Sequence, residues 1–290
     1  MANSISSYTD AQIMRALLTK DFSSIGRRFE DDVITAVKMG GFAGAQNLDA
    51  VVLPSVTEIR AFAFRDTALS ILDITWGDVV SIGVGAFMSG GFNALPQNLT
   101  LSSLTALGNG AFAGTSSVKN QRLLSISLPL WTGSAPSEPG ASVSNTGVFS
   151  YCSALQTVSF PELLAISSYM FQGCAALAQI ALPKASSIGS NAFTSCSNLT
   201  KIDIGGAVTS MSSGFLSGTS KLEALILRGV TTAPTLGSST FNSTRIASGA
   251  AYVYVPRALK STFEVANRWS TYASQLRAIE DYPDVCGAAA

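Results

Sequence analysis

The stretch ISSYMFQGCAALAQIALP, residues 166–183, decides the fold because a close copy of it, IGSNAFTSCSNLTKIDI, follows at residues 188–204. Both copies carry an isoleucine, then a phenylalanine, then a cysteine, and finally a leucine that opens a short apolar alternation. The two phenylalanines, Phe171 and Phe193, are 22 residues apart. A pattern that recurs at this spacing indicates a structural unit built many times rather than a site built once.

The same phenylalanine recurs along most of the chain, and a Leu-x-x-Ile-x-Leu core accompanies many of its copies. Successive intervals are 22, 23, 25, 37, 22, 22, 22 and 26 residues. This period and this core predict a leucine-rich-repeat solenoid, a right-handed coil with one short parallel strand in each repeat of about 22 residues. The phenylalanines are Phe42, Phe64, Phe87, Phe112, Phe149, Phe171, Phe193, Phe215 and Phe241.

The two faces of each predicted strand differ in character. In LAQIALP, residues 177–183, Ile180 and Leu182 alternate with Gln179 and Ala181. Because successive side chains of a strand point to opposite faces, the first pair is expected inside and the second pair outside. Pro183 then ends the strand, since proline has no N–H for the next ladder bond. The phenylalanines are expected to form one column inside the coil.

The copies resemble the BspA-like leucine-rich repeats of bacterial surface proteins, some protist surface proteins and phage or prophage proteins, through the pattern I-G-x-x-A-F-x-x-C-x-x-L-x-x-I-x-L-P. The resemblance covers about residues 42–256 and is strongest over residues 149–204. Residues 251–283 also resemble the cap often found after such repeats, a last strand followed by a helical segment. The resemblance implies a non-enzymatic recognition or adhesion module that binds a protein or a glycan.

Three segments are predicted along the chain. Residues 1–41 form a helical N-terminal cap or docking segment, in which TDAQIMRALLTK at residues 9–20 begins with capping-box spacing. Residues 42–256 form the solenoid, with an insertion at about 129–147. Residues 257–290 form a helical C-terminal cap and tail, in which Trp269 is expected to pack.

Composition excludes several classes of partner. The 290 residues are 47% apolar and only 12% charged, and the charges cancel without forming acidic or basic runs, so nucleic acid is not expected as a partner. No stretch approaches the roughly 20 uninterrupted apolar residues of a membrane helix, so membrane insertion is not expected. The N-terminus does not resemble a secretory signal. The expected location is therefore a virion, a bacterial surface if a signal was removed, or otherwise the cytoplasm.

Catalytic, cofactor and metal sites are not predicted. The chain contains no histidine, which removes the commonest general base and metal ligand. Cys152, Cys174 and Cys196 each follow a phenylalanine by three residues, and such a straight ladder suits tetrahedral zinc poorly. A small buried side chain is the expected role of that position. Cys286 is expected to be exposed in the tail.

Two surfaces are predicted to bind the partner. The first is the outward face of the strands, where a pair of tyrosines near the C-terminal cap either anchors a partner or packs under the cap. The second is the insertion, whose root holds a tryptophan that is either an exposed contact or a plug. The predicted partner-binding residues are Asp73, Gln179, Lys201, Asp203, Tyr252, Tyr254 and Trp131.

Two biological settings fit these features. In the first, the module recognises a protein or glycan at a cell surface. In the second, it is a virion structural protein of a phage or prophage, such as a tail, fibre or decoration protein with a possible role in host-receptor binding, and residues 1–41 dock it into a larger assembly. Neighbouring genes for tail or capsid proteins would favour the second setting.

Overall fold

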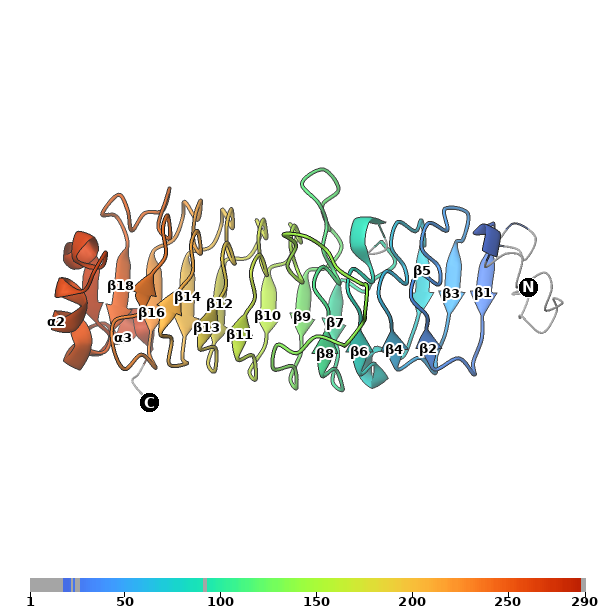
Figure 1. Cartoon of the computed structure of the whole chain (residues 1–290), viewed down its shortest axis with the longest axis horizontal. Coiled ribbons are helices and arrows are strands. Elements are labelled where there is room, and N and C mark those ends of the chain that lie inside the picture. The colour runs from blue at the N-terminus through green and yellow to red at the C-terminus, as the bar shows by residue number, and fades with distance from the viewer. Residues whose placement is uncertain (1–17, 22, 24–26, 91–92, 288–290) are drawn as a thin grey trace. The chain divides into compact units, whose positions relative to one another are not determined.

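The computed structural model describes residues 18–21, 23, 27–90 and 93–287 (Figure 1). The chain divides into two compact units, residues 1–152 and residues 153–290, and each is described by itself. Within each unit most strands of successive turns pair in parallel and in register. The fold is a parallel β-solenoid of the leucine-rich-repeat kind, as the repeat predicted.

Unit 1 has a three-residue strand in each turn on one side and a two-residue strand on the return path. The longer strands are β1 (Arg28–Glu30), β3 (Ala50–Val52), β5 (Ile71–Asp73), β7 (Asn98–Thr100) and β9 (Ser125–Ser127). The return strands are β2 (Ala36–Val37), β4 (Glu58–Ile59), β6 (Ser81–Ile82) and β8 (Ala106–Leu107), in the sheet order β2-β4-β6-β8. The described part of the unit also holds two 3-10 turns, η3 (Trp76–Asp78) and η4 (Met88–Gly90).

Unit 2 repeats this plan and adds helices. Its longer strands are β10 (Thr157–Ser159), β12 (Gln179–Leu182), β14 (Lys201–Ile204), β16 (Ala224–Leu227), β18 (Tyr252–Val255) and β19 (Leu276–Ala278). Its return strands are β11 (Ala165–Ile166), β13 (Ser187–Ile188), β15 (Ser210–Met211) and β17 (Thr235–Leu236). The helices are α2 (Arg257–Val265), η5 (Ser270–Gln275), η6 (Ile279–Asp281) and α3 (Pro283–Cys286).

The return strands explain the isoleucine and glycine of the repeat. Ile188 of β13 is buried and pairs with neighbouring turns on both sides. The next residue, Gly189, approaches the preceding turn so closely that a Cβ there would lie 2.3 Å from the backbone nitrogen of Ser168. Glycine is therefore required wherever the backbones of consecutive turns touch in this way.

The phenylalanines of unit 1 form the predicted column. From Phe42 to Phe149 each ring stacks on the next, with centroids 5.3–5.8 Å apart and planes within 10°. All of these rings are buried. Because an offset stack adds to the burial of each ring, the column ties every turn to its neighbours.

In unit 2 the column departs from the predicted register. Phe171 and Phe193 stack with centroids 5.0 Å apart, but the Phe215 ring lies nearly perpendicular to that of Phe193, at 76°. Elsewhere the residues two before and two after a column side chain mostly have positive φ, and in this turn those residues, Gly214 (φ 68) and Gly218 (φ 78), flank Leu216. The column position thus belongs to Leu216, and the expectation that Phe215 would fill it was wrong. Phe215 packs one position earlier, where most turns have a smaller residue.

The C-terminal end of unit 2 is closed by aromatic packing. Trp269 is fully buried, with its ring 4.9 Å from that of Phe263 in α2 and 5.8 Å from that of Phe241. Its indole N–H donates to the carbonyl of Pro234 at 2.6 Å. The packing role predicted for Trp269 is confirmed. The sheet does not end at β18. After α2 and η5 the chain forms β19, which pairs in parallel with β18.

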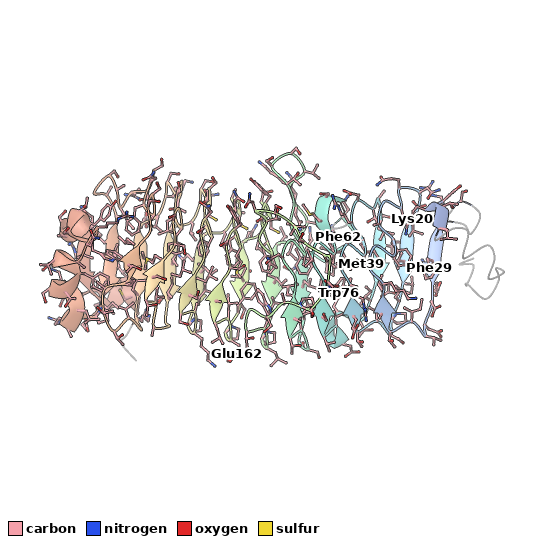
Figure 2. All side chains as sticks on the ribbon, viewed as in Figure 1. Lys20, Phe29, Met39, Phe62, Trp76 and Glu162 are labelled. Carbon is pink, nitrogen blue, oxygen red and sulfur yellow. The ribbon has the colours of Figure 1, made fainter. Side chains whose placement is uncertain are left out.

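The predicted N-terminal helix over residues 9–20 lies almost wholly outside the described residues. Among the described ones, the Lys20 ammonium donates to the carbonyls of Gly40 and Gly41. Lys20, Phe29 and Met39 line an apolar cavity at this end of unit 1, and Figure 2 labels all three. Burial lowers the pKa of Lys20.

Candidate binding surface

The strand face of unit 2 brings three of the predicted binding residues together. On β12 and β14, Gln179 lies beside Lys201 and Ala181 beside Asp203. The four line an open groove of about 440 Å³ that continues over the outward side chains of β10. The outward strand side chains in the groove are small or polar, whereas Phe160, Pro161 and Pro183 add apolar surface to its lining.

Asp203 is held by a residue that the sequence reasoning missed. Arg228 follows β16 directly and forms two hydrogen bonds of 2.8 Å with the two carboxylate oxygens of Asp203. This hydrogen bonding raises the pKa of Arg228. The sequence did carry a signal, because Arg228 stands where other strands are followed by proline or glycine, such as Pro183 and Gly205. A bidentate pair fixes both side chains in one geometry.

The two tyrosines of β18 have different environments. The Tyr252 side chain is partly exposed, and the Arg277 guanidinium lies over its ring at 4.2 Å. Tyr254 is only 4% exposed, because the ring of Tyr282 covers it at 5.5 Å. Burial raises the pKa of Tyr254. The expectation that Tyr254 presents its ring to a partner is therefore corrected: it packs under the C-terminal segment.

That segment, residues 279–286, folds back over the outward face of unit 2. It covers outward side chains of β16 and β18 and forms one apolar cluster with them. Cys286 lies in this cluster and is 2% exposed, so the expectation of an exposed cysteine was wrong. The cluster consists of Ala224, Ile226, Tyr254, Ile279 and Cys286, with Val285 packed against it.

Asp73 lies in unit 1, on the outward face of β5. Its side chain is exposed, and so is that of Ile71 on the same strand, at 50%. An exposed isoleucine beside a carboxylate is consistent with the predicted contact role of Asp73, which stays a prediction.

The insertion lies against unit 1. Trp131 at its root is 1% exposed, and its indole N–H donates to the carbonyl of Ser134 at 2.8 Å. The same carbonyl accepts the backbone N–H of Leu107 at 2.8 Å, which extends the β8 edge. Of the two roles left open for Trp131, the plug is the one that the structure has. Its inclusion among the partner-binding residues is corrected, since a buried ring offers no contact surface.

Glu138 fastens the insertion to two turns of unit 1. One carboxylate oxygen accepts the backbone N–H of Ala61 at 2.6 Å, and the other accepts that of Val84 at 2.9 Å. In unit 2 a serine hydroxyl plays the same part at one such position, where Ser168 accepts the N–H of Ser190. The sequence reasoning saw Glu138 only as an acid without a partner.

Replacing Glu138 with alanine is expected to destabilise unit 1 by about 2 kcal/mol, because two backbone donors lose a charged acceptor. Limited proteolysis should then cut within residues 129–147 faster than in the wild type, and urea unfolding gives the free energy. As a control, Glu162→Ala removes an exposed carboxylate paired with Lys184 and should change stability by less than about 0.5 kcal/mol. Equal effects of the two substitutions would contradict the role of Glu138.

Sequence comparison settles the family. A profile of the BspA type leucine rich repeat region matches residues 27–127 and 143–251, in six copies. This chain belongs to the BspA-type leucine-rich repeat family. Among curated proteins, no sequence matches it significantly.

Several solved structures similar to this BspA-type chain come from bacteria. A leucine-rich repeat protein from Eubacterium ventriosum is 19% identical, with 86% of this chain and 76% of that chain covered and a TM-score of 0.43. A leucine rich cell surface protein from Faecalibacterium prausnitzii is 15% identical, with 87% and 77% covered and a TM-score of 0.32. The pneumococcal vaccine antigen PcpA is 14% identical, with 87% and 66% covered and a TM-score of 0.41.

The cysteine of the BspA-type repeat fills a small buried position. The Cys196 thiol donates to the carbonyl of Phe171 at 3.0 Å, and the Cys152 thiol donates to that of Phe112 at 3.3 Å. In three turns without cysteine, a threonine takes this position and donates to the carbonyl three residues before it, as Thr219 does to Leu216 at 2.8 Å. A small side chain with a weak donor therefore meets the need of the turn, which accords with the structural role predicted for the thiols.

Alkaline pH is expected to destabilise this BspA-type fold. Burial raises the pKa of Cys196 from 9.0 to about 12. Since the folded thiol holds its proton where the unfolded one has lost it, stability is complete below pH 9 and falls as pH rises toward 12, by up to about 1.4 kcal/mol per unit for this thiol. Urea unfolding at about pH 8 and about pH 10 should show the fall, and Cys196→Ala should reduce its slope. An unchanged slope would contradict the assignment.

The part of the chain that the structure describes shows neither a metal-binding cluster nor a membrane-spanning helix. No group of three or more histidine, cysteine, aspartate or glutamate side chains lies close enough to hold a metal ion. Among the same residues, no helix has the length and apolar character needed to cross a membrane.

Proposed function

We propose that this chain is a non-enzymatic recognition module that binds a protein or glycan partner through the strand face of unit 2. The observation that carries the proposal is the groove over β10, β12 and β14, where Gln179, Lys201 and Asp203 converge. Amide, ammonium and carboxylate groups on rigid strands can donate and accept hydrogen bonds without reorganising. Sugar hydroxyls and peptide backbones are ligands that such groups recognise.

The groove is open rather than enclosed, which suits an extended contact more than a buried small molecule. Its two main charges, Lys201 and Asp203, are successive outward residues of one strand, β14. The Asp203 carboxylate already forms an ion pair with Arg228. A carboxylate engaged in this way is poorly placed to serve as a general base. The arrangement therefore favours binding over turnover.

The decisive variant places a large charge in the groove without disturbing the core. Ala181 is exposed on β12, and Ser187 is exposed on β13 of the return sheet. Ala181→Arg is expected to weaken partner binding at least about tenfold, whereas Ser187→Arg should leave it within about twofold. Binding is measured on a glycan array and on immobilised envelope proteins. Equal losses, or a loss confined to Ser187→Arg, would exclude the strand face as the contact surface.

The biological setting of this binding role stays a prediction in its two forms, a cell-surface module or a virion component. Neighbouring genes separate the two: tail or capsid genes favour the virion form. The groove and its variants are the same in either setting.

A further inference from the structure

The segment over residues 279–286 makes contacts that differ from those of a terminal helix packed on a core. It lies on outward strand positions, which in a solenoid are the positions available for binding. Its one helical turn, α3, is too short to be stable alone, because the conformational entropy lost in forming a first turn exceeds what its one hydrogen bond contributes. The surface beneath it must therefore hold it in shape.

The contacts combine apolar burial with recognition of the main chain. Cys286 is buried against the outward side chains Ala224 and Ile226, with Val285 beside them. Two cationic side chains of the strand face then bind successive backbone carbonyls of the segment. Lys201 donates to the carbonyl of Val285 at 2.6 Å, and Arg228 donates to that of Cys286.

Two features of the receiving surface are preorganised. Asp203 holds the Arg228 guanidinium through two hydrogen bonds, and neither bond involves the segment. Lys201 and Asp203 stand on a strand that pairs on both sides, with β12 and with β16. Ligand-independent order of this kind lowers the entropic cost of binding and is typical of a built peptide site.

We propose that this part of the strand face is a binding surface for a short peptide segment, and that residues 279–286 are its intramolecular occupant. The peptide it fits has an aromatic residue followed three and four positions later by aliphatic or small apolar residues, presented in a single helical turn with two free carbonyls. The tail itself supplies this pattern in Tyr282, Val285 and Cys286. The inference deepens the proposed function by naming the partner class at the C-terminal end of the groove.

A tethered occupant sets a threshold for outside partners. The effective concentration of a segment on a short tether is on the order of 1 mM. If the free segment binds with a dissociation constant of about 0.1 mM, the tethered copy occupies the surface about ten to one and weakens an outside peptide about tenfold. A partner must then bind more tightly than the tail, or the tail must be removed.

Removing residues 282–290 tests the proposal directly. The truncation keeps Glu280 and Asp281, which contact Arg257 at the start of α2. The probe is a fluorescent synthetic peptide of residues 279–287, followed by fluorescence anisotropy in reducing buffer. The truncated chain is expected to bind this peptide at least about tenfold more tightly than the full chain does. No binding by the truncated chain, or equal binding by both chains, would overturn the proposal.

Matched controls separate specific recognition of the peptide from non-specific hydrophobic binding to the patch that the truncation exposes. A peptide with Tyr282→Ala and Val285→Asp should lose binding without any effect on the fold. On the protein, Arg228→Ala combined with Asp203→Asn should weaken binding, and Lys184→Ala, which removes an exposed ion pair with Glu162 in the same unit, should not. Binding that survives the peptide changes would count against the proposed surface.

One more variant covers a truncation that fails to fold. Val285→Asp in the full chain places a charge against the apolar cluster and should release the tail while every other residue stays. It should raise binding of the wild-type peptide toward the value sought for the truncation, and unchanged binding overturns the proposal. The Ala181→Arg comparison does not involve the tail peptide, so failure here and failure of the proposed function are distinguishable.

Discussion

Replacing Gly189 with alanine is expected to destabilise unit 2 by about 3 kcal/mol or more. A Cβ at this position would lie 2.3 Å from the backbone nitrogen of Ser168 and 2.7 Å from the carbonyl carbon of Ser167. Backbone atoms cannot rotate away as a side chain can, so consecutive turns must separate. That separation weakens the pairing of β11 with β13, including Ile166 with Ile188.

Urea unfolding followed by circular dichroism and by tryptophan fluorescence measures the effect of Gly189→Ala, since Trp269 lies in the same unit. The matched control is Gly77→Ala. A Cβ added at Gly77 would meet no heavy atom within 4 Å, and the φ of Gly77 is not positive, so alanine should be neutral there or stabilise by up to about 1 kcal/mol. Similar losses in the two variants would mean that the close approach of the turns is not what requires glycine.

Phe193→Ala is expected to cost about 4 kcal/mol, within the range for removing a buried aromatic ring. The Phe193 side chain is fully buried, with its ring 5.0 Å from that of Phe171 and 5.6 Å from that of Phe215. Truncation therefore removes contacts to two neighbouring turns and leaves a cavity between them. Because each repeat is stabilised mainly by its neighbours, the loss should be felt across unit 2.

The control for Phe193→Ala is Leu164→Ala, a truncation of a side chain that is 49% exposed in the same unit. It should change the free energy of unfolding by less than about 0.5 kcal/mol. Both variants are compared at the same urea concentrations, with the midpoint and the slope reported separately. A cost below about 1 kcal/mol for Phe193→Ala would refute the column as the main tie between turns.

The sequence predicted the solenoid well because the repeat averages over many copies. Periodic features such as the Leu-x-x-Ile-x-Leu strand and the phenylalanine column are supported by many turns, so chance matches in one turn do not matter. The same averaging hid the one irregular turn. Phe215 keeps the expected spacing in the sequence, but the positive-φ glycines place Leu216 in the column instead. Backbone conformation, rather than residue type, decides the register there.

Features that occur once in the chain were harder to predict. The sequence identified Gln179, Lys201 and Asp203 as outward residues because the strand pattern fixes their direction. It could not show that residues 279–286 return to the same face, since no period constrains a segment after the last repeat. Tyr254 was placed among the partner-binding residues for this reason: its direction was right, but Tyr282, which covers it, lies beyond the last repeat.

The attachment of the insertion through Glu138 has a consequence for how such chains diverge. Its carboxylate accepts the main-chain N–H groups of Ala61 and Val84, so the attachment does not depend on a particular side chain at either position. The same place on unit 1 can therefore hold loops of different sequence. A loop long enough to place one carboxylate between these two N–H groups can attach in the same way. The loop can therefore be exchanged, in evolution or by grafting, without changes to the strands beneath it.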